Sequence, residues 1–204
     1  MDTLKGNGVL HIQEHIFYTA IDLFVEFGYE SVSVRDIATA AGVEVEAVYN
    51  CYASKKELLS SIYQFCIDMH RNAEPDLDEL LRMAETASLS DITRKIGCRL
   101  NPANQVVYDK ILLIAMHDFS FNTESAQLIE ETLFCPVERN LTPVLNKLLD
   151  LGRIEPLDTS VFSSIFKNYC FASAVLNSST FKIDSETKRQ GYAMLFSLLK
   201  PVNT

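Results

Sequence analysis

Two glycine breaks within residues 24–59 constrain the fold of this 204-residue chain more than any other feature of its sequence. Gly28 ends a stretch whose apolar residues recur every three or four positions, and Gly42 interrupts the chain again shortly afterwards. Ser33 and Ser54 are each followed, three positions later, by a carboxylate residue, which is the spacing of a helix capping box. The stretch therefore predicts short helices joined by tight turns, the layout of a helix-turn-helix motif.

A spaced series of residues runs through this stretch and begins slightly before it. Its members are Ala20, Phe24, Gly28, Tyr29, Ser33, Ile37, Ala38, Ala41, Gly42, Val43, Val48, Tyr49, Tyr52, Ser54, Lys55, Leu58 and Leu59. In residue type and spacing the series resembles the amino-terminal pattern of the tetracycline-repressor (TetR) family of bacterial transcription regulators. The resemblance implies an all-α fold, with an N-terminal three-helix helix-turn-helix DNA-binding domain over residues 1–54 and a C-terminal helical ligand-binding and dimerisation domain over residues 55–204. It also implies a regulator without a cofactor rather than an enzyme.

The resemblance further assigns residues that would contact double-stranded DNA. Positions that commonly hold phosphates carry Ser33, Tyr49 and Lys55, and positions that face base edges carry Val45, Glu46, Ala47 and Asn50. Arg35 and Lys56, two of the few cations nearby, complete the expected set. Lys56 lies in the first turn of a predicted helix, where free amide groups and the positive end of the helix dipole suit a phosphate.

The charge of the expected DNA-binding domain departs from this pattern. Residues 1–60 contain four cations and nine carboxylates, a net charge of −5, whereas residues 61–204 contain 14 cations and 18 carboxylates. Affinity for a nucleic acid comes largely from phosphates neutralised by lysine and arginine. A carboxylate can also accept a hydrogen bond from the cytosine amino group, so Glu46 is a candidate base reader. The alternative is a helical small-molecule-binding dimer whose DNA binding is weak or lost.

A second motif indicates a different class of protein. His11 to His15 spell H-x-x-E-H, the arrangement of an inverted zinc-peptidase motif, and histidines four apart share one face of a helix. No obvious third ligand follows, so we expect surface residues and no bound metal. The five cysteines, Cys51, Cys66, Cys98, Cys135 and Cys170, are widely spaced and form no paired ligand set. They are expected to be reduced residues of helix cores.

Helical periodicity continues through the rest of the chain. Helices are predicted from the Ser54 cap to about residue 72, and then at 76–86, 89–98, 104–119, 124–134, from Pro136 to Gly152, at 161–175, and from Ser185 to Pro201. The start of the chain lacks a signal peptide, and no apolar run approaches the ~20 residues that cross a bilayer. A cytoplasmic protein is expected.

The last two predicted helices are too broadly apolar for one intramolecular face. Phe162, Ile165, Phe166, Tyr169 and Phe171 point in several directions along the first of them. A homodimer sealed by these helices is the simplest explanation, and the resemblance implies the same. The alternative is that they form the core of a monomer.

The expected function is ligand-responsive transcriptional regulation, most often repression, by a homodimer on a near-palindromic operator. A small molecule bound in the helical body would favour a spacing of the two DNA-binding domains that no longer fits the operator. Candidate ligand-binding residues are Tyr108, His117, Phe119, Phe166 and Tyr169. Their aromatic bias indicates a small apolar or aromatic effector.

Overall fold

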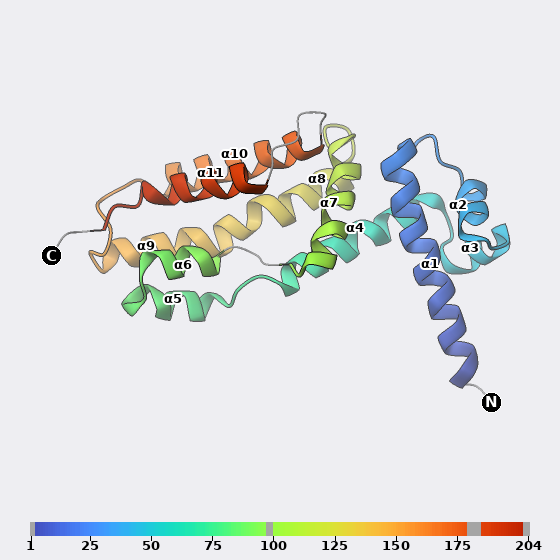
Figure 1. The fold of residues 1–204 in the computed structure, drawn as a ribbon, viewed down its shortest axis with the longest axis horizontal. Coiled ribbons are helices and arrows are strands. Elements are labelled where there is room, and N and C mark those ends of the chain that lie inside the picture. Colours follow the sequence, from blue (N-terminus) through green and yellow to red (C-terminus); the bar gives the residue numbers. More distant parts are fainter. Residues whose placement is uncertain (1–2, 97–99, 179–184, 202–204) are drawn as a thin grey trace. The chain divides into compact units, whose positions relative to one another are not determined.

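The computed structural model describes residues 3–96, 100–178 and 185–201 (Figure 1). These residues form an all-α fold, as predicted from the sequence. The chain divides into two compact units: the first comprises residues 1–68 and 102–128, and the second comprises residues 69–101 and 129–204. Within the described residues, no helix is both long and apolar enough to cross a membrane.

The first unit begins with α1 (Thr3–Phe27), α2 (Val34–Ala41) and α3 (Val45–Cys51), and the local signals for these helices are confirmed. Gly28 and Gly42 have φ angles of 80° and 64°, the left-handed conformation that ends a helix at low cost. The Ser33 hydroxyl accepts a hydrogen bond from the Asp36 amide, and the Asp36 carboxylate accepts one from the Ser33 amide. This reciprocal capping box starts α2 at the predicted position.

Helix α4 (Lys55–Asn72) follows a second cap of slightly different form. The Ser54 hydroxyl accepts from the Glu57 amide, as predicted, but the Glu57 carboxylate accepts from the amide of Ala53 rather than from that of Ser54. In the first unit α4 buries Leu58, Leu59, Ile62, Tyr63 and Cys66. The same unit contains α7 (Pro102–Met116), which packs against α1, and most of α8 (Thr123–Ile129).

The second unit packs a long apolar core between its helices. Its elements are α5 (Leu77–Thr86), α6 (Leu89–Ile96), η1 (Glu130–Phe134), η2 (Val137–Leu141), α9 (Thr142–Asp150), α10 (Thr159–Ser178) and α11 (Ser185–Ser197). Fully buried members of the core include Leu80 of α5, Ile92 of α6 and Leu145 of α9. Phe166 of α10 and Leu199, just after α11, belong to the same core.

The predicted break between residues 134 and 136 is wrong, because helical conformation continues from Thr123 to Asp150. Pro136 lacks an amide hydrogen and crowds the preceding turn, which normally interrupts an α-helix. Here the turns on both sides widen to the π form, in which the amide of Cys135 donates to the carbonyl of Glu130 and the amide of Thr142 donates to the carbonyl of Val137. In the π pattern the carbonyl of Glu131 would accept from the amide of residue 136, but proline has no amide hydrogen. Nη2 of Arg139 donates to this carbonyl instead, at 3.4 Å. A side chain therefore supplies the hydrogen bond that proline removes.

Candidate nucleic-acid interface

The exposed face of α3 carries three of the residues that the sequence predicts to contact DNA. Val48 is buried and anchors the helix, while Glu46, Tyr49 and Asn50 are exposed. Val45 and Ala47, also predicted to face bases, are only half-buried. The helix is short and begins directly after the Gly42 turn, and Glu44 at its start makes no capping hydrogen bond with its side chain. Its polar face therefore consists of one carboxylate, one phenol and one amide.

Ser33, predicted to hold a phosphate, has its hydroxyl proton directed elsewhere. The Ser33 hydroxyl donates to the Asp36 carboxylate at 2.6 Å, in addition to accepting from the Asp36 amide at 3.2 Å. The Asp36 carboxylate accepts from both the hydroxyl and the amide of Ser33, and these two hydrogen bonds lower the pKa of Asp36 because they stabilise its charged form. In this conformation Ser33 serves the start of α2 and retains no proton for a phosphate oxygen.

Lys55, the second predicted phosphate contact, lies against the connection between α1 and α2. Its Nζ donates to the carbonyl oxygens of Tyr29 at 2.8 Å and of Val32 at 2.9 Å, and it lies 4.1 Å from the centre of the Tyr29 ring. Burial is the main cause that raises the pKa of Tyr29, and the carboxylates of Glu30, Glu124 and Asp118 raise it further. The Lys55 ammonium thus has acceptors within the protein.

Lys56 is the exposed cation of the same helical turn, and a carboxylate of α8 competes for it. The Lys56 Nζ lies 3.8 Å from Oε1 of Glu124, whose Oε2 accepts a hydrogen bond from the Ser60 hydroxyl. Arg35 is exposed on α2 and has no ion-pair partner among the described residues. Arg35 is therefore the cation of the described α2–α4 region that is best placed to meet a phosphate without breaking an existing contact.

A buried chain of hydroxyls joins α4 to α8 within the first unit. Ser125, fully buried, donates to the Asp118 carboxylate at 2.6 Å, and the Tyr63 hydroxyl lies 3.0 Å from the Ser125 oxygen. Since Ser125 uses its proton on Asp118, Tyr63 donates to Ser125. Burial raises the pKa of Tyr63, which therefore stays protonated. Sequence periodicity gave no signal for this connection, because its members come from distant segments.

The predicted ligand-binding residues belong to both units. In the first unit Tyr108 is buried on α7, Phe119 is half-buried and His117 is exposed. In the second unit Phe166 is buried on α10 and Tyr169 is half-buried, and both rings lie against Tyr192 of α11. Phe166 also packs on Phe196. The role of these residues in ligand binding stays a prediction.

An ion-pair network that the sequence analysis missed lies in the second unit. Arg139 donates to both carboxylate oxygens of Glu74, with Nη2–Oε1 at 2.5 Å, and to Glu131 at 3.3 Å. Asn140 donates to Glu74 as well, and Arg71 donates to Glu131 at 3.0 Å. His70, almost fully buried, lies 3.8 Å from Glu74. The spacing of four between His70 and Glu74 is a usable sequence signal, whereas the participation of Arg139 depends on tertiary packing.

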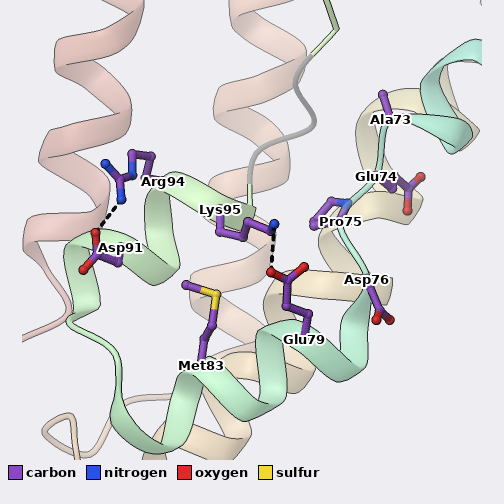
Figure 2. Close-up of a pocket in the computed structure, with 9 residues that line it drawn as sticks. All are labelled: Ala73, Glu74, Pro75, Asp76, Glu79, Met83, Asp91, Arg94 and Lys95. Atoms are coloured by element: carbon purple, nitrogen blue, oxygen red, sulfur yellow. Dashed lines mark hydrogen bonds and ion pairs between the residues drawn. The ribbon is translucent and has the colours of Figure 1, made fainter.

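A cleft of about 470 Å³ lies beside this network, between α5, α6 and the α4–α5 connection. Figure 2 shows the residues that line it. Its lining residues are Ala73, Glu74, Pro75, Asp76, Glu79, Met83, Asp91, Arg94 and Lys95. Both cations are paired with carboxylates, Arg94 with Asp91 of the same helix α6 at 2.6 Å and Lys95 with Glu79 of α5 at 3.0 Å. Its charges therefore largely satisfy one another.

The H-x-x-E-H motif lies on the exposed surface of α1. His11, Glu14 and His15 are all exposed there. Within the described part of the chain, no group of three or more histidine, cysteine or carboxylate residues is arranged to hold a metal ion. Of the described cysteines, Cys66 is buried and Cys51, Cys135 and Cys170 are partly buried, all as free thiols, and Cys98 lies outside the described residues.

Comparison with known proteins agrees with this geometry. Residues 16–62 match the model of the family described as bacterial regulatory proteins, tetR family. No curated protein sequence matches the chain.

Among solved structures, a transcriptional regulator from Saccharomonospora viridis in complex with choline has a TM-score of 0.69 at 14% identity, covering 94% of this chain and 98% of that one. The TetR-family regulator PfmR from Thermus thermophilus has a TM-score of 0.60 at 20% identity, with 93% and 99% covered. A TetR-family regulator from Mesorhizobium loti has a TM-score of 0.61 at 16% identity, with 94% and 96% covered. All three proteins are described as transcriptional regulators.

Proposed function

We propose that this chain is a DNA-binding transcriptional regulator that represses its targets in a ligand-responsive way, because residues 16–62 match the model of the tetR family of bacterial regulatory proteins. The observation that carries the proposal is the exposed polar face of α3, held by a glycine turn and a complete capping box on α2. A helix in this setting can enter the major groove and present Glu46 and Asn50 to base edges, with Tyr49 directed at the phosphates. Such a regulator acts on DNA in the cytoplasm.

The proposed DNA contacts are of two kinds, base readers and phosphate contacts. Glu46 and Asn50 are the proposed base readers, with Val45 and Ala47 at the edge of the same surface. Arg35, Tyr49 and Lys56 are the proposed phosphate contacts, and Ser33 joins them only if its hydroxyl turns away from Asp36. Two cations are few for a DNA reader, so we expect modest, salt-sensitive affinity.

We propose that the regulator is a homodimer joined through α10 and α11. Large apolar side chains are exposed in pairs four residues apart on both helices: Val161 and Ile165 on α10, and Met194 on α11 with Leu198 just after it. Residues four apart on α10 lie on the same helix face. Such a dimer would place two α3 helices on the half-sites of a near-palindromic operator.

The proposed effector is a small apolar or aromatic molecule, and the candidate residues for binding it are Tyr108, His117 and Phe119 in the first unit and Phe166 and Tyr169 in the second. Binding would shift the population toward a form whose two DNA-binding domains no longer match the operator. The complex of the Saccharomonospora viridis protein with choline adds a quaternary ammonium compound to the panel worth screening, since aromatic side chains bind such cations.

A second candidate function follows from the charge of the DNA-binding domain. Residues 1–60, which include this domain and the start of α4, carry a net charge of −5, and Lys55 and Lys56 both have partners within the protein. These observations favour a helical ligand-binding dimer that has lost tight DNA binding.

Selection of duplexes from a random DNA library separates the two functions. The protein is first unfolded and refolded to remove any bound effector, and selection is run at fixed low salt. We expect enrichment of a near-palindromic sequence and loss of the complex when an effector is added. If no sequence is enriched, the regulator proposal is wrong and the ligand-binding dimer is favoured.

A further inference from the structure

The ammonium group of Lys55 already uses its binding capacity inside the first unit. Two carbonyl oxygens accept its protons at 2.8 and 2.9 Å, and the Tyr29 ring covers a further side of it at 4.1 Å. An ammonium has three donors and no acceptor. A phosphate would reach it fully only by displacing a carbonyl or the ring.

The two carbonyls belong to the turn that determines where α2 begins. The amide of Val32 donates to the Tyr29 carbonyl at 3.3 Å and closes this turn, and the next residue, Ser33, caps α2. Val32 is buried, so the turn is also fixed by packing. Lys55 is the first residue of α4 and therefore joins the start of α4 to the start of α2.

This connection extends to α3, the helix proposed to enter the major groove. Helix α2 packs against both α1 and α3, so a shift at its start would move α3 as well. A lysine also places a positive charge at the unfavourable end of the α4 dipole, and the two carbonyls compensate for that cost. The arrangement suits a compact ammonium on a flexible stem.

We propose that Lys55 is a positioning residue for DNA recognition, which orients α2 and α3 through the Tyr29–Val32 turn and does not itself neutralise a phosphate. The inference rests on the proposed DNA-binding function. Lys56, its neighbour, is the matched control, because its side chain is exposed and its contact with Glu124 is long.

Lys55→Met and Lys56→Met in the full chain separate positioning from phosphate binding. Methionine keeps an unbranched side chain but removes the charge. Affinities are measured for a duplex selected by the wild type and for a scrambled duplex of equal length, over a range of KCl concentrations. All measurements are made well below the melting temperature of each variant, followed by circular dichroism.

We expect Lys55→Met to reduce the ratio of the two affinities about tenfold, similar to one mismatched base pair, with an unchanged salt slope. Lys56→Met should leave this ratio unchanged and lower the slope by about one unit. Tyr29→Leu, which removes the ring from the ammonium, should reduce the ratio in the same direction as Lys55→Met. Tyr29→Phe keeps the ring and should preserve the ratio.

Three outcomes overturn the proposal. If Lys55→Met loses one unit of salt slope at an unchanged affinity ratio, Lys55 binds a phosphate directly. If Lys55→Met only lowers the melting temperature, Lys55 stabilises the fold without positioning α3. Should Lys55→Met fail to fold, an unchanged ratio in Tyr29→Leu overturns the proposal instead. A wild type that prefers neither duplex is a different failure, that of DNA binding itself, and it is visible before any substitution.

Discussion

The phenol ring of Tyr169 on α10 occupies the space that a β carbon at Gly191 on α11 would need. The same ring lies edge-on to Tyr192 at a centroid distance of 5.0 Å, which limits its freedom to move aside. The absence of a side chain at Gly191 thus lets α10 and α11 approach each other at the helix pair proposed as the dimer interface.

We expect Gly191→Ala to destabilise the protein by about 1–2 kcal/mol, because overpacking outweighs the ~0.5–1 kcal/mol that alanine normally gains over glycine in a helix. Urea denaturation would measure the loss. In a Tyr169→Ala background the same substitution should become stabilising by about 0.5–1 kcal/mol. Destabilisation of equal size in both backgrounds would show that the ring is not the obstacle.

Charged substitutions on α10 and α11 should distinguish the proposed dimer interface from the core beneath it. Ile165 and Met194 are 47% and 72% exposed, so Ile165→Asp and Met194→Asp should yield folded monomers in sedimentation experiments. Phe166 is buried against Tyr192 and Phe196, so Phe166→Asp should unfold the second unit instead. Dimers that persist in both exposed variants at micromolar concentration would place the interface elsewhere.

Local signals in the sequence predicted most of the first unit. The capping box of Ser33 and Asp36 spans three residues, and the left-handed turns at Gly28 and Gly42 depend on single residues. The start of α4 at Lys55 follows from the Ser54 cap in the same way. Features set by neighbouring residues can be read from sequence because their geometry does not depend on distant parts of the chain.

The features that the sequence did not reveal depend on tertiary contacts. The acceptors of Lys55 lie 26 and 23 residues before it, and nothing in the local pattern indicates them. Pro136 normally ends a helix, yet here the widened turns and the Arg139 contact to Glu131 keep the helix continuous. The Arg139–Glu74 pair also joins residues 65 apart. The partners of Lys55 and Glu74 are brought in by the fold, whereas at Pro136 widened turns and the side chain of Arg139, eight residues after Glu131 in the same helix, override the local preference.

The stability of the second unit should decrease as the pH falls below neutral. The pKa of His70 is lowered from 6.5, mainly by burial. The charge of Glu74 acts in the opposite direction, and the charge of Arg139 adds to the lowering. A histidine with a lowered pKa in the folded state binds its proton more readily in the unfolded chain. The contribution of neutral His70 to the unfolding free energy is therefore complete above pH 6.5, and it is lost as the pH falls from 6.5 to the pKa of the folded state. His70→Gln should therefore reduce the difference in unfolding free energy between about pH 7.5 and about pH 5.5. His117→Gln, at an exposed histidine, should leave that difference unchanged.

Removal of the charge of Glu124 should strengthen DNA binding through Lys56. The Glu124 carboxylate lies 3.8 Å from the Lys56 ammonium, and an exposed pair of this kind contributes about 0–1 kcal/mol. Glu124→Gln should therefore tighten binding to any duplex by up to about fivefold. Glu155→Gln changes the net charge equally at an exposed position of the second unit and controls for the overall field. Equal effects of the two substitutions would mean that the Lys56 contact does not limit affinity.

Glu46 is the exposed carboxylate on the α3 face, where it either reads a base or repels the backbone. If it accepts a hydrogen bond from a cytosine amino group, Glu46→Ala should relax the preference at one operator position by roughly 1–3 kcal/mol. Glu44, at the start of the same helix, makes no capping hydrogen bond with its side chain and is the matched control. Glu44→Ala should tighten binding to all duplexes slightly and leave the preference intact, because only a repulsive charge is removed. We expect the two substitutions to differ in this way when each variant is taken through selection from a random library at one low salt concentration. If Glu46→Ala instead tightens binding without changing the preference, Glu46 does not read a base, and Asn50 becomes the principal candidate for base recognition on α3.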